Sequence, residues 1–523
     1  TNLNNYGSAS NNNIYYAGAT EDATHAIFYN GTVYTMAGFK TLAAPKDAAS
    51  SRELPPFTDV SATPYNLHLS AATATQCESG GTTVSTPVNI TVDWDADARY
   101  PNPGYPTTTA NPASNPDVGA DEFAGIPLDI TPPMITYVPI ANQCSSATMI
   151  LTATITDASG VPTTGTGLPQ LFYKVNAGSY TNIQGVSIGS NQYTFTFTPS
   201  IVIGDSVSYY VVAQDNILPP NLSANPSAGA AGFTPNPPAC STPPTTPNKY
   251  KMIPTLASTI SIPMDYATIE AAIAALNSSC IPSGGVTFNV AAGHAETLSG
   301  PLAGLITASG TASDPIIFQK SGTGSNPLII ASGLGTIAPT TTIGSNGDGV
   351  IILSGGDYIT FDGIDIQENA SASTGTLKSE YGFLLKKASG TDACKNVTIR
   401  NCNITLDKTV IYSFGIFVSN FSGSTAVTVT STGGRSENIR IYNNTISNVY
   451  GGIILTGFNA PTPFDFYDQN IEIGKDGANT INDFAGGATG AMGIYTVYQN
   501  NLKIINNVLT SAVGNTGTLY GMY

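Results

Sequence analysis

The sequence predicts an all-β protein in which right-handed parallel β-helix segments are joined by an immunoglobulin-like β-sandwich. The first observation behind this prediction is composition. Among 523 residues there are 53 Gly and 35 Pro, only 10% are charged, and Trp occurs once, which favours strands and turns. The second is length, because a chain of this size exceeds what one hydrophobic core holds. The third is a pair of short motifs that recur through the C-terminal half, as in solenoid proteins.

The first segment, residues 1–125, has one strong local signal. Asn30-Gly31 stands between the apolar stretches Ala26–Tyr29 and Thr32–Tyr34, and Asn-Gly between such stretches is typical of a two-residue hairpin turn. A long irregular stretch follows the hairpin.

The second segment, residues 126–251, is predicted to be an immunoglobulin-like β-sandwich with Pro-rich linkers. Runs of alternating apolar residues, separated by turn-rich loops, have the length and spacing of sandwich strands. The expected strands are 147–155, 170–175, 192–197 and 206–213. Pro-rich stretches near 132–133 and 235–244 bracket them, as semi-rigid linkers would.

The third segment, residues 252–523, is predicted to begin with a cap helix and continue as a right-handed parallel β-helix. The stretch 266–276 is amphipathic, with Ile269, Ile273 and Leu276 on one face, so it is expected to close the first coil. A Gly followed by a short apolar strand then recurs at intervals of roughly 30 to 40 residues. These glycines are Gly382, Gly415, Gly452, Gly493 and Gly521.

The other recurring motif is an alternating strand that turns at an Asn or Gly corner. Its copies begin at Tyr358, Asn396, Asn438, Asn470 and Asn501. Alternate Ile, Val and Leu side chains point inward, while Asn or Gly tolerates left-handed backbone at the corner and Asn can stack its amide on the next coil. Each coil would bury the face of its neighbour.

Charge and hydropathy exclude two classes of partner. The formal net charge of −16 leaves no basic stripe for phosphates, so nucleic acid is not expected to bind. No apolar run reaches the length of a membrane span, so no membrane insertion is expected.

Two sets of carboxylates are candidate calcium ligands. Asp93, Asp95 and Asp97 alternate along the chain, as calcium ligands do, but the loop lacks the Gly and distal Glu of an EF-hand. A structural network with Arg99 is the alternative. The second set is Asp129, Asp157 and Asp215, which could converge at one pole of the sandwich, although aspartates are also common in turns and linkers. No other cofactor is expected.

Six cysteines are too few for a disulfide framework in a chain of this length. Cys144 and Cys240 flank the sandwich at its entry and exit, so we expect a disulfide between them, with free buried thiols as the alternative. Cys394 and Cys402 lie close to one coil strand and form a second candidate pair. Cys77 and Cys280 remain without an expected partner.

Catalysis and glycan binding are weighed against structural roles. A carbohydrate-cleaving β-helix needs clustered acids on one exposed face, whereas Asp362 is expected to turn a corner and Asp365 to be isolated. No catalytic residue is therefore predicted. Exposed Tyr442, Tyr495 and Tyr498 on coil faces could stack on sugars, and aromatic ladders that stabilise the coils are the alternative.

Several stretches resemble a known family: secreted multidomain surface proteins of Bacteroidetes, many of them type IX secretion cargo, with β-helix and immunoglobulin-like modules. The resemblance rests on Asn12–Tyr16 with Met36–Lys40, on Phe57–Leu69, on Val92–Arg99 with Pro116–Glu122, and on 129–133, 156–161 and 212–216. It implies that residues 1–125 hold the C-terminal coils and closure of a β-helix. It also implies export to the cell surface or to a filament.

The expected function is a non-catalytic, extracellular structural and adhesive surface protein. The sequence opens inside closing coils and stops inside a growing stack, so it is interpreted as a repeat unit of a longer fibre or giant adhesin. Its partners would be other copies or repeats in the fibre, and surface glycans. The alternative is a β-helix polysaccharide-degrading enzyme, a lyase or a hydrolase, or a glycan-binding module.

Overall fold

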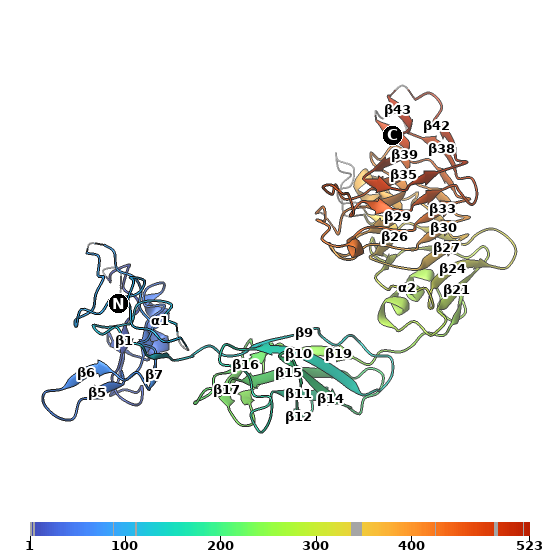
Figure 1. Cartoon of the computed structure of the whole chain (residues 1–523). Helices are drawn as coiled ribbons and strands as arrows, with labels where there is room; N and C mark the ends of the chain where they lie inside the picture. The colour runs from blue at the N-terminus through green and yellow to red at the C-terminus, as the bar shows by residue number, and fades with distance from the viewer. Residues whose placement is uncertain are drawn as a thin grey trace. The chain divides into compact units, whose positions relative to one another are not determined.

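The computed structural model describes residues 3, 6–86, 88–109, 112–335, 348–423, 425–485, 490–515 and 517–523. These fall into two compact units. The first comprises Thr1–Pro139, Thr148–Phe197 and Ser208–Lys249, and the second comprises Ile140–Ala147, Thr198–Val207 and Tyr250–Tyr523. Strands dominate both units (Figure 1). Within the described ranges, no helix has the length and apolar character needed to cross a membrane.

The second unit contains a parallel β-helix made of three long sheets (Figure 1). The first sheet consists of β20 (Thr259–Ile262), β21 (Val286–Ala291), β24 (Ile316–Ser321), β27 (Ile359–Asp362), β30 (Thr398–Arg400), β33 (Arg440–Tyr442), β37 (Glu472–Ile473) and β41 (Lys503–Ile504). The second consists of β22 (Ala295–Thr297), β25 (Leu328–Ile330), β28 (Asp365–Gln367), β31 (Asn403–Thr405), β34 (Thr445–Ser447), β38 (Thr480–Phe484) and β42 (Val508–Ser511). The third consists of β23 (Leu305–Ile306), β26 (Gly349–Ser354), β29 (Tyr381–Lys386), β32 (Phe414–Ser419), β35 (Gly451–Thr456), β39 (Ala491–Val497) and β43 (Leu519–Met522).

Both recurring motifs map onto this architecture, which confirms the predicted β-helix. Every Gly-led copy lies in the third sheet, and each Asn-corner copy supplies the first sheet, with the complete copies continuing into the second. The corner residues Asn401, Asn443 and Asn506 have φ of 58°, 55° and 61°, the left-handed conformation that Asn tolerates. The corner therefore sets the turn from one sheet to the next.

Helix α2 (Ile269–Ser278) covers the first coils, as predicted from its amphipathic pattern. Its N-cap is Thr268, whose side chain accepts a hydrogen bond from the Ala271 backbone. Ile269, Ile273 and Leu276 are buried and join the same core as the strands of the coils. The helix thus shields the apolar end of the stack.

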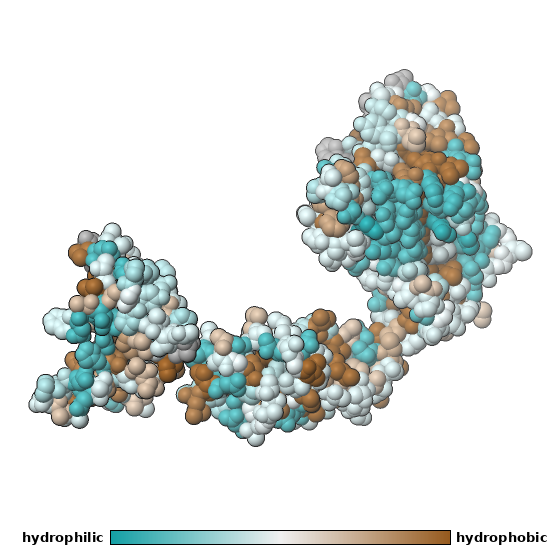
Figure 2. Space-filling view, viewed as in Figure 1, coloured by the Kyte–Doolittle hydropathy of each residue, from teal (hydrophilic) through white to brown (hydrophobic). Residues whose placement is uncertain are grey.

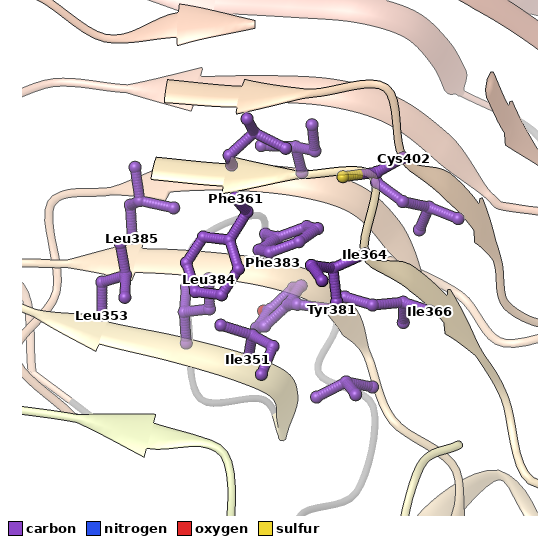
Figure 3. Close-up of a cluster of buried hydrophobic side chains, with 14 of the residues drawn as sticks. Ile351, Leu353, Phe361, Ile364, Ile366, Tyr381, Phe383, Leu384, Leu385 and Cys402 are labelled. Atoms are coloured by element: carbon purple, nitrogen blue, oxygen red, sulfur yellow. The ribbon is translucent and has the colours of Figure 1, made fainter. Parts of the chain in front are cut away.

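The interior of the β-helix is filled by stacked side chains from successive coils (Figure 3). The ring centroids of Phe288 and Phe318 lie 4.3 Å apart, and those of Phe318 and Phe361 lie 5.2 Å apart. Phe383 meets Phe361 edge to face at 5.1 Å. Such contacts add to the stabilisation from burial.

The middle segment is a two-sheet sandwich. One sheet has the order β13 (Val186–Gly189), β14 (Gln192–Phe197), β10 (Met149–Thr156) and β9 (Met134–Tyr137). The other has the order β12 (Thr181–Gln184), β11 (Gln170–Val175), β15 (Ser206–Gln214) and β16 (Leu222–Asn225), with β19 (Asn248–Lys251) also paired to β15. That this sandwich is immunoglobulin-like stays a prediction. A separate hairpin joins β17 (Ala231–Thr234) and β18 (Ala239–Thr242).

The first segment has short strands and one helix. The predicted Asn-Gly hairpin is present as β2 (Phe28–Tyr29) and β3 (Val33–Tyr34). Strand β1 (Ile14–Tyr15) pairs in parallel with β4 (Ser51–Arg52), β7 (Ala74–Thr75) pairs in parallel with β8 (Ile126–Pro127), and β5 (Phe57–Asp59) pairs antiparallel with β6 (Asn66–Leu69).

Helix α1 (Met36–Ala43) occupies the stretch that resembled a closing coil. Its buried residues are Met36, Phe39 and Ala43, and its N-cap is Thr35. That this segment closes a β-helix stays a prediction.

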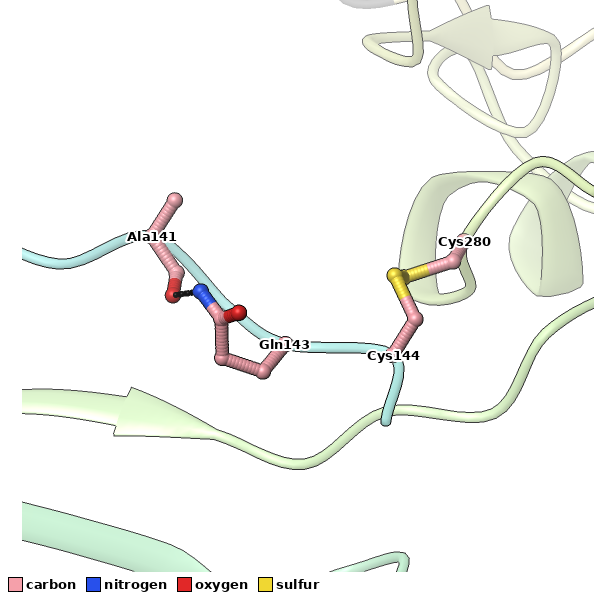
Figure 4. The surroundings of a disulfide bond; sticks show 4 residues. All are labelled: Ala141, Gln143, Cys144 and Cys280. Atoms are coloured by element: carbon pink, nitrogen blue, oxygen red, sulfur yellow. Dashed lines mark hydrogen bonds between the residues drawn. A yellow bond between two sulfur atoms is a disulfide. The ribbon is translucent and has the colours of Figure 1, made fainter. Parts of the chain in front are cut away.

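The expected Cys144–Cys240 disulfide is wrong. Cys144 is bonded to Cys280 instead, with 5.9 Å between their Cα atoms (Figure 4). Gln143 pairs with Met252, and Thr255 pairs with Cys280, so backbone pairing brings the two cysteines together. Cys240 is free and buried in β18, where its thiol donates to the Tyr210 hydroxyl at 3.7 Å.

The second expected pair is also wrong, because Cys394 and Cys402 are free and buried. Strand β30 lies between them in the chain. Three extended residues span about 10 Å, which carries the two thiols beyond disulfide reach. Cys77 is also free and buried.

Candidate functional site

The two stretches Val92–Arg99 and Pro116–Glu122 fold against each other in the first segment. Asp93 Oδ1 accepts hydrogen bonds from the backbone N–H groups of Asp95 and Asp97, both at 2.9 Å. Its other oxygen accepts from the Glu122 N–H at 2.9 Å. Both oxygens of this carboxylate therefore hold backbone in place.

Arg99 also links these two stretches. Its guanidinium donates to the Gly119 carbonyl at 2.9 Å and to the Asp117 carbonyl, and its Nε lies 3.2 Å from Glu122. Burial raises the pKa of Asp117 to about 7 although its oxygens accept from the backbone N–H groups of Ser79 and Phe123. The structural network with Arg99 is thus present.

A groove of about 590 Å³ opens beside this network. Hairpin β5–β6 supplies Tyr65 and His68 to its lining, and the turn after Asp93 supplies Trp94 and Asp95. The Trp94 side chain, from the chain's single Trp, is 87% exposed, and that of Tyr65 is 59% exposed. Both aromatic rings are thus open to contact with a partner.

Polar groups converge in the same groove. His68 Nδ1 lies 3.2 Å from Asp121 Oδ1 and 3.6 Å from Asp95 Oδ2. The hydrogen bond with Asp121, followed by the charges of Asp121 and Asp95, raises the pKa of His68. Asp121 is itself positioned because its Oδ2 accepts from the Leu69 N–H at 2.8 Å. The groove therefore combines aromatic faces with hydrogen-bonding groups.

The structure corrects the first predicted calcium set. Among the described residues, Asp93, Asp95 and Asp97 do not form a group whose ligand atoms all lie within 4.8 Å of one another, whereas His68, Asp95 and Asp121 do. The reason is that Asp93 turns both oxygens toward backbone N–H groups. Sequence reasoning missed this group because His68, on the β5–β6 hairpin, and Asp121, in the stretch Pro116–Glu122, are both distant from Asp95 in the chain.

The second predicted set does converge. Asp129, Asp157 and Asp215 each place one carboxylate oxygen within 4.8 Å of the others. Ser159 Oγ lies within hydrogen-bonding distance of both Asp129, at 2.5 Å, and Asp157, at 2.7 Å. Asn221 donates to the buried Asp215 at 2.8 Å. These three carboxylates could hold a divalent cation, and oxygen ligands are those that calcium prefers.

The acids of the β-helix have structural partners. Asp362 accepts from Arg400 and Asn401, and Asp365 accepts from Asn326 and Asn403. These contacts connect one coil to the next.

Glu368 is buried in the β-helix and accepts from two backbone N–H groups, so its carboxylate also holds chain in place. A glycosidase instead needs a pair of carboxyl groups flanking an open substrate site. Neither these contacts nor those of Asp362 and Asp365 suggest such a pair.

Of the three coil tyrosines predicted to be exposed, Tyr498 is exposed, Tyr442 and Tyr495 are half-buried, and all three have neighbours. Tyr442 accepts a hydrogen bond from Arg400 at 2.8 Å, and the rings of Tyr495 and Tyr523 stack at 5.3 Å. Tyr498 meets Tyr467 edge to face at 5.6 Å. The ladder interpretation therefore describes these residues better than a sugar-binding one.

Comparisons with known proteins give little further information. No family model matches the chain, and no curated protein matches it. An alginate lyase from Paenibacillus sp. str. FPU-7 is similar over 49% of this chain and 78% of its own, with 17% identity and a TM-score of 0.30. The catalytic domain of a GH87 α-1,3-glucanase in complex with nigerose is similar over 73% of this chain and 80% of its own, with 11% identity and a TM-score of 0.13. Similarities this low do not assign an activity to the present chain.

Proposed function

We propose that this protein is an extracellular structural and adhesive surface protein that binds a neutral carbohydrate in the groove at Trp94. The observation that supports it best is the exposure of Trp94 and Tyr65 beside His68 and two carboxylates. Aromatic faces stack on the apolar faces of sugar rings, and carboxylates and imidazole bond the hydroxyl groups. The β-helix would serve as the scaffold.

The charge of the groove favours neutral sugars. Asp95 and Asp121 are the carboxylates that face His68, and the whole chain has a formal net charge of −16. A glycan that contains uronic acids would bring like charges together, which lowers its affinity. Hydrophilic side chains also cover much of the β-helix face seen in Figure 2, as suits a scaffold in water.

The single Trp allows a direct test. Titration with neutral xylo-, manno- and cello-oligosaccharides is expected to change Trp94 fluorescence, while oligouronates leave it unchanged. Tyr65→Ala keeps the reporter and is expected to weaken binding about fivefold to tenfold, since an aromatic contact contributes about 1 kcal/mol. Tyr29→Ala, at a tyrosine that is 68% exposed elsewhere in the first segment, is the matched control and should bind as the unaltered protein does.

Two outcomes would contradict the proposal. Unchanged Trp94 fluorescence with every neutral glycan would remove carbohydrate as the ligand. Release of shorter oligosaccharides during the titration, followed by chromatography, would favour the alternative of a polysaccharide-degrading enzyme.

We also propose export to the cell surface and association with other copies in a fibre, from the resemblance to type IX secretion cargo. Immunogold labelling of the producing cells is expected to place the protein outside the cell, on filaments with a regular axial repeat. Labelling confined to the cell interior would reject this part of the proposal.

Calcium binding by Asp129, Asp157 and Asp215 is a further part of the proposal. A cation that binds only the folded sandwich raises its stability by about 2.7 kcal/mol at a hundredfold excess over Kd. Calcium is therefore expected to raise the unfolding temperature, and EDTA to reverse the rise. Asp157→Asn should abolish the calcium effect and Asp59→Asn, in an exposed turn, should preserve it; an equal response in both variants would reject the site.

A further inference from the structure

A lysine and an aspartate meet in the interior of the β-helix unit. Lys387 directly follows β29, and Asp468 begins strand β36 (Asp468–Gln469). Both side chains are 0% exposed, and Lys387 Nζ lies 3.0 Å from Asp468 Oδ1. Placing two charges away from water costs several kcal/mol each unless hydrogen bonds satisfy them fully.

The hydrogen bonding of this pair is incomplete. Asp468 Oδ1 also accepts from the Ser436 N–H at 2.7 Å, but the other oxygen, Oδ2, is buried without a partner. An ammonium group has three protons to donate, and Asp468 Oδ1 is its one acceptor among the described residues. An ion pair here would leave an oxygen and N–H groups buried without hydrogen-bond partners, which is unfavourable.

We propose that Lys387 and Asp468 are joined by an intramolecular isopeptide bond. The lysine nitrogen attacks Cγ of the protonated carboxyl, a C–N bond forms, and the Cγ–Oδ2 bond breaks. Oδ2 leaves as water with the carboxyl proton and one amine proton, so no oxidant or other reactant is needed. The product is a neutral amide.

The positions of the neighbouring groups suit each part of this reaction. The oxygen without a partner is the one that leaves. Oδ1 becomes the amide oxygen and keeps the Ser436 N–H, which also stabilises the negative charge that develops on Oδ1 during attack. Burial raises the pKa of Asp468, which favours the protonated carboxyl that the attack requires.

The bond would link distant coils covalently. Lys387 lies between β29 and β30. Asp468 begins β36, which precedes β37, and β37 lies two strands beyond β30 in the first sheet. A cross-link between such positions restricts the unfolded chain as a disulfide does, without depending on redox conditions. The inference is independent of carbohydrate binding at the groove.

Mass spectrometry of the full chain, denatured and reduced, tests the proposal. The expected mass is lower than that of the sequence by one water. After trypsin, the peptide 387–395 should be found joined to the peptide 441–475, as a branched species sequenced by fragmentation. A mass equal to that of the sequence, with these two peptides separate, would overturn the proposal.

Two lysine variants complete the test. Lys387→Arg keeps the positive charge but cannot form the amide, so its mass should equal that of its sequence. Lys386→Arg alters the neighbouring lysine, which donates to the Ser422 carbonyl at 3.3 Å, and should retain the water loss. Loss of water in Lys387→Arg would place the modification elsewhere and reject the Lys387–Asp468 bond. If a variant fails to fold, the mass and peptides of the unaltered protein decide the matter.

Discussion

At the scale of single residues, buried amides connect the coils of the β-helix. Asn444 is buried and donates through Nδ2 to the Ile399 carbonyl at 2.9 Å, while its Oδ1 accepts from the Cys402 N–H at 3.0 Å. Asn479 repeats the arrangement one coil further on, donating to the Ile441 carbonyl at 2.9 Å. These asparagine side chains provide hydrogen-bond partners for buried backbone groups near the corner.

Replacing Asn444 is expected to be costly. Asn444→Ala leaves the Ile399 carbonyl and the Cys402 N–H buried without partners, so the free energy of unfolding should fall by about 2–5 kcal/mol. Urea denaturation measures this difference. The control is Asn403→Ala, at the exposed first residue of β31, which loses one solvent-accessible hydrogen bond to Asp365. A loss below about 1 kcal/mol is expected there, and equal losses in the two variants would contradict the structural role of the buried amides.

Glu380 is expected to make the stability of the β-helix depend on pH. Its side chain is 1% exposed, and burial, with the nearby charges of Asp348 and Glu368, raises its pKa to about 8. One oxygen accepts from the Asp348 N–H at 2.7 Å, and the other is unpartnered. In the unfolded chain the pKa of a glutamate is near 4.3. Between about pH 4.3 and pH 8, the folded protein therefore holds a proton on Glu380 that the unfolded chain has released.

Stability should therefore fall as pH rises across this window, by up to about 1.4 kcal/mol per pH unit. In Glu380→Gln the side chain cannot ionise, so this part of the pH dependence should disappear. Urea midpoints at pH 5, 6, 7 and 8 measure it. Parallel pH profiles for the two proteins would show that Glu380 does not titrate in this range.

At the scale of strands, a column of glycines explains the spacing seen in the sequence. A Cβ atom on Gly382, Gly415, Gly452 or Gly493 would lie 3.0 Å or less from the carbonyl oxygen of the glycine in the next coil. Each would also press on an Ile or Leu side chain of the second sheet. Glycine is required here by close approach of two coils, and not by an unusual backbone angle.

A single methyl group should therefore disturb the stack. Gly452→Ala forces the backbone of two coils apart and is expected to lower the free energy of unfolding by about 1–3 kcal/mol. Gly300→Ala is the matched control, since a Cβ there meets nothing within 4 Å, and it should be neutral or slightly stabilising. Thermal unfolding of both variants measures the contrast, and equal melting temperatures would show that the column is not closely packed.

At the scale of the whole chain, one disulfide links segments far apart in the sequence. Cys144 and Cys280 are separated by 136 residues and belong to the same compact unit. The bond attaches the stretch 140–147 to Cys280, which follows the C-cap residue of the cap helix α2. A cross-link that closes so long a loop restricts the unfolded chain strongly.

Removal of this bond should destabilise the second unit. Cys144→Ser is expected to cost about 2–5 kcal/mol, measured by calorimetry under non-reducing conditions. Cys240→Ser, at a cysteine that is free, controls for replacement of a thiol. A larger loss in Cys240→Ser than in Cys144→Ser would contradict the assigned pairing.

Sequence alone determined the β-helix, because its information is local and repeated. Apolar alternation, corner residues and column glycines recur from coil to coil in the C-terminal part of the stack, and each copy reinforces the others. The cap helix, the Asn-Gly hairpin and the four sandwich strands were likewise predictable from short-range patterns. Only the tertiary structure decided which distant side chains meet. It paired Cys144 with Cys280, brought His68 to Asp95 and Asp121, and buried Lys387 against Asp468. Such contacts depend on how loops return to the body of the fold, and no periodic pattern in the chain encodes that return.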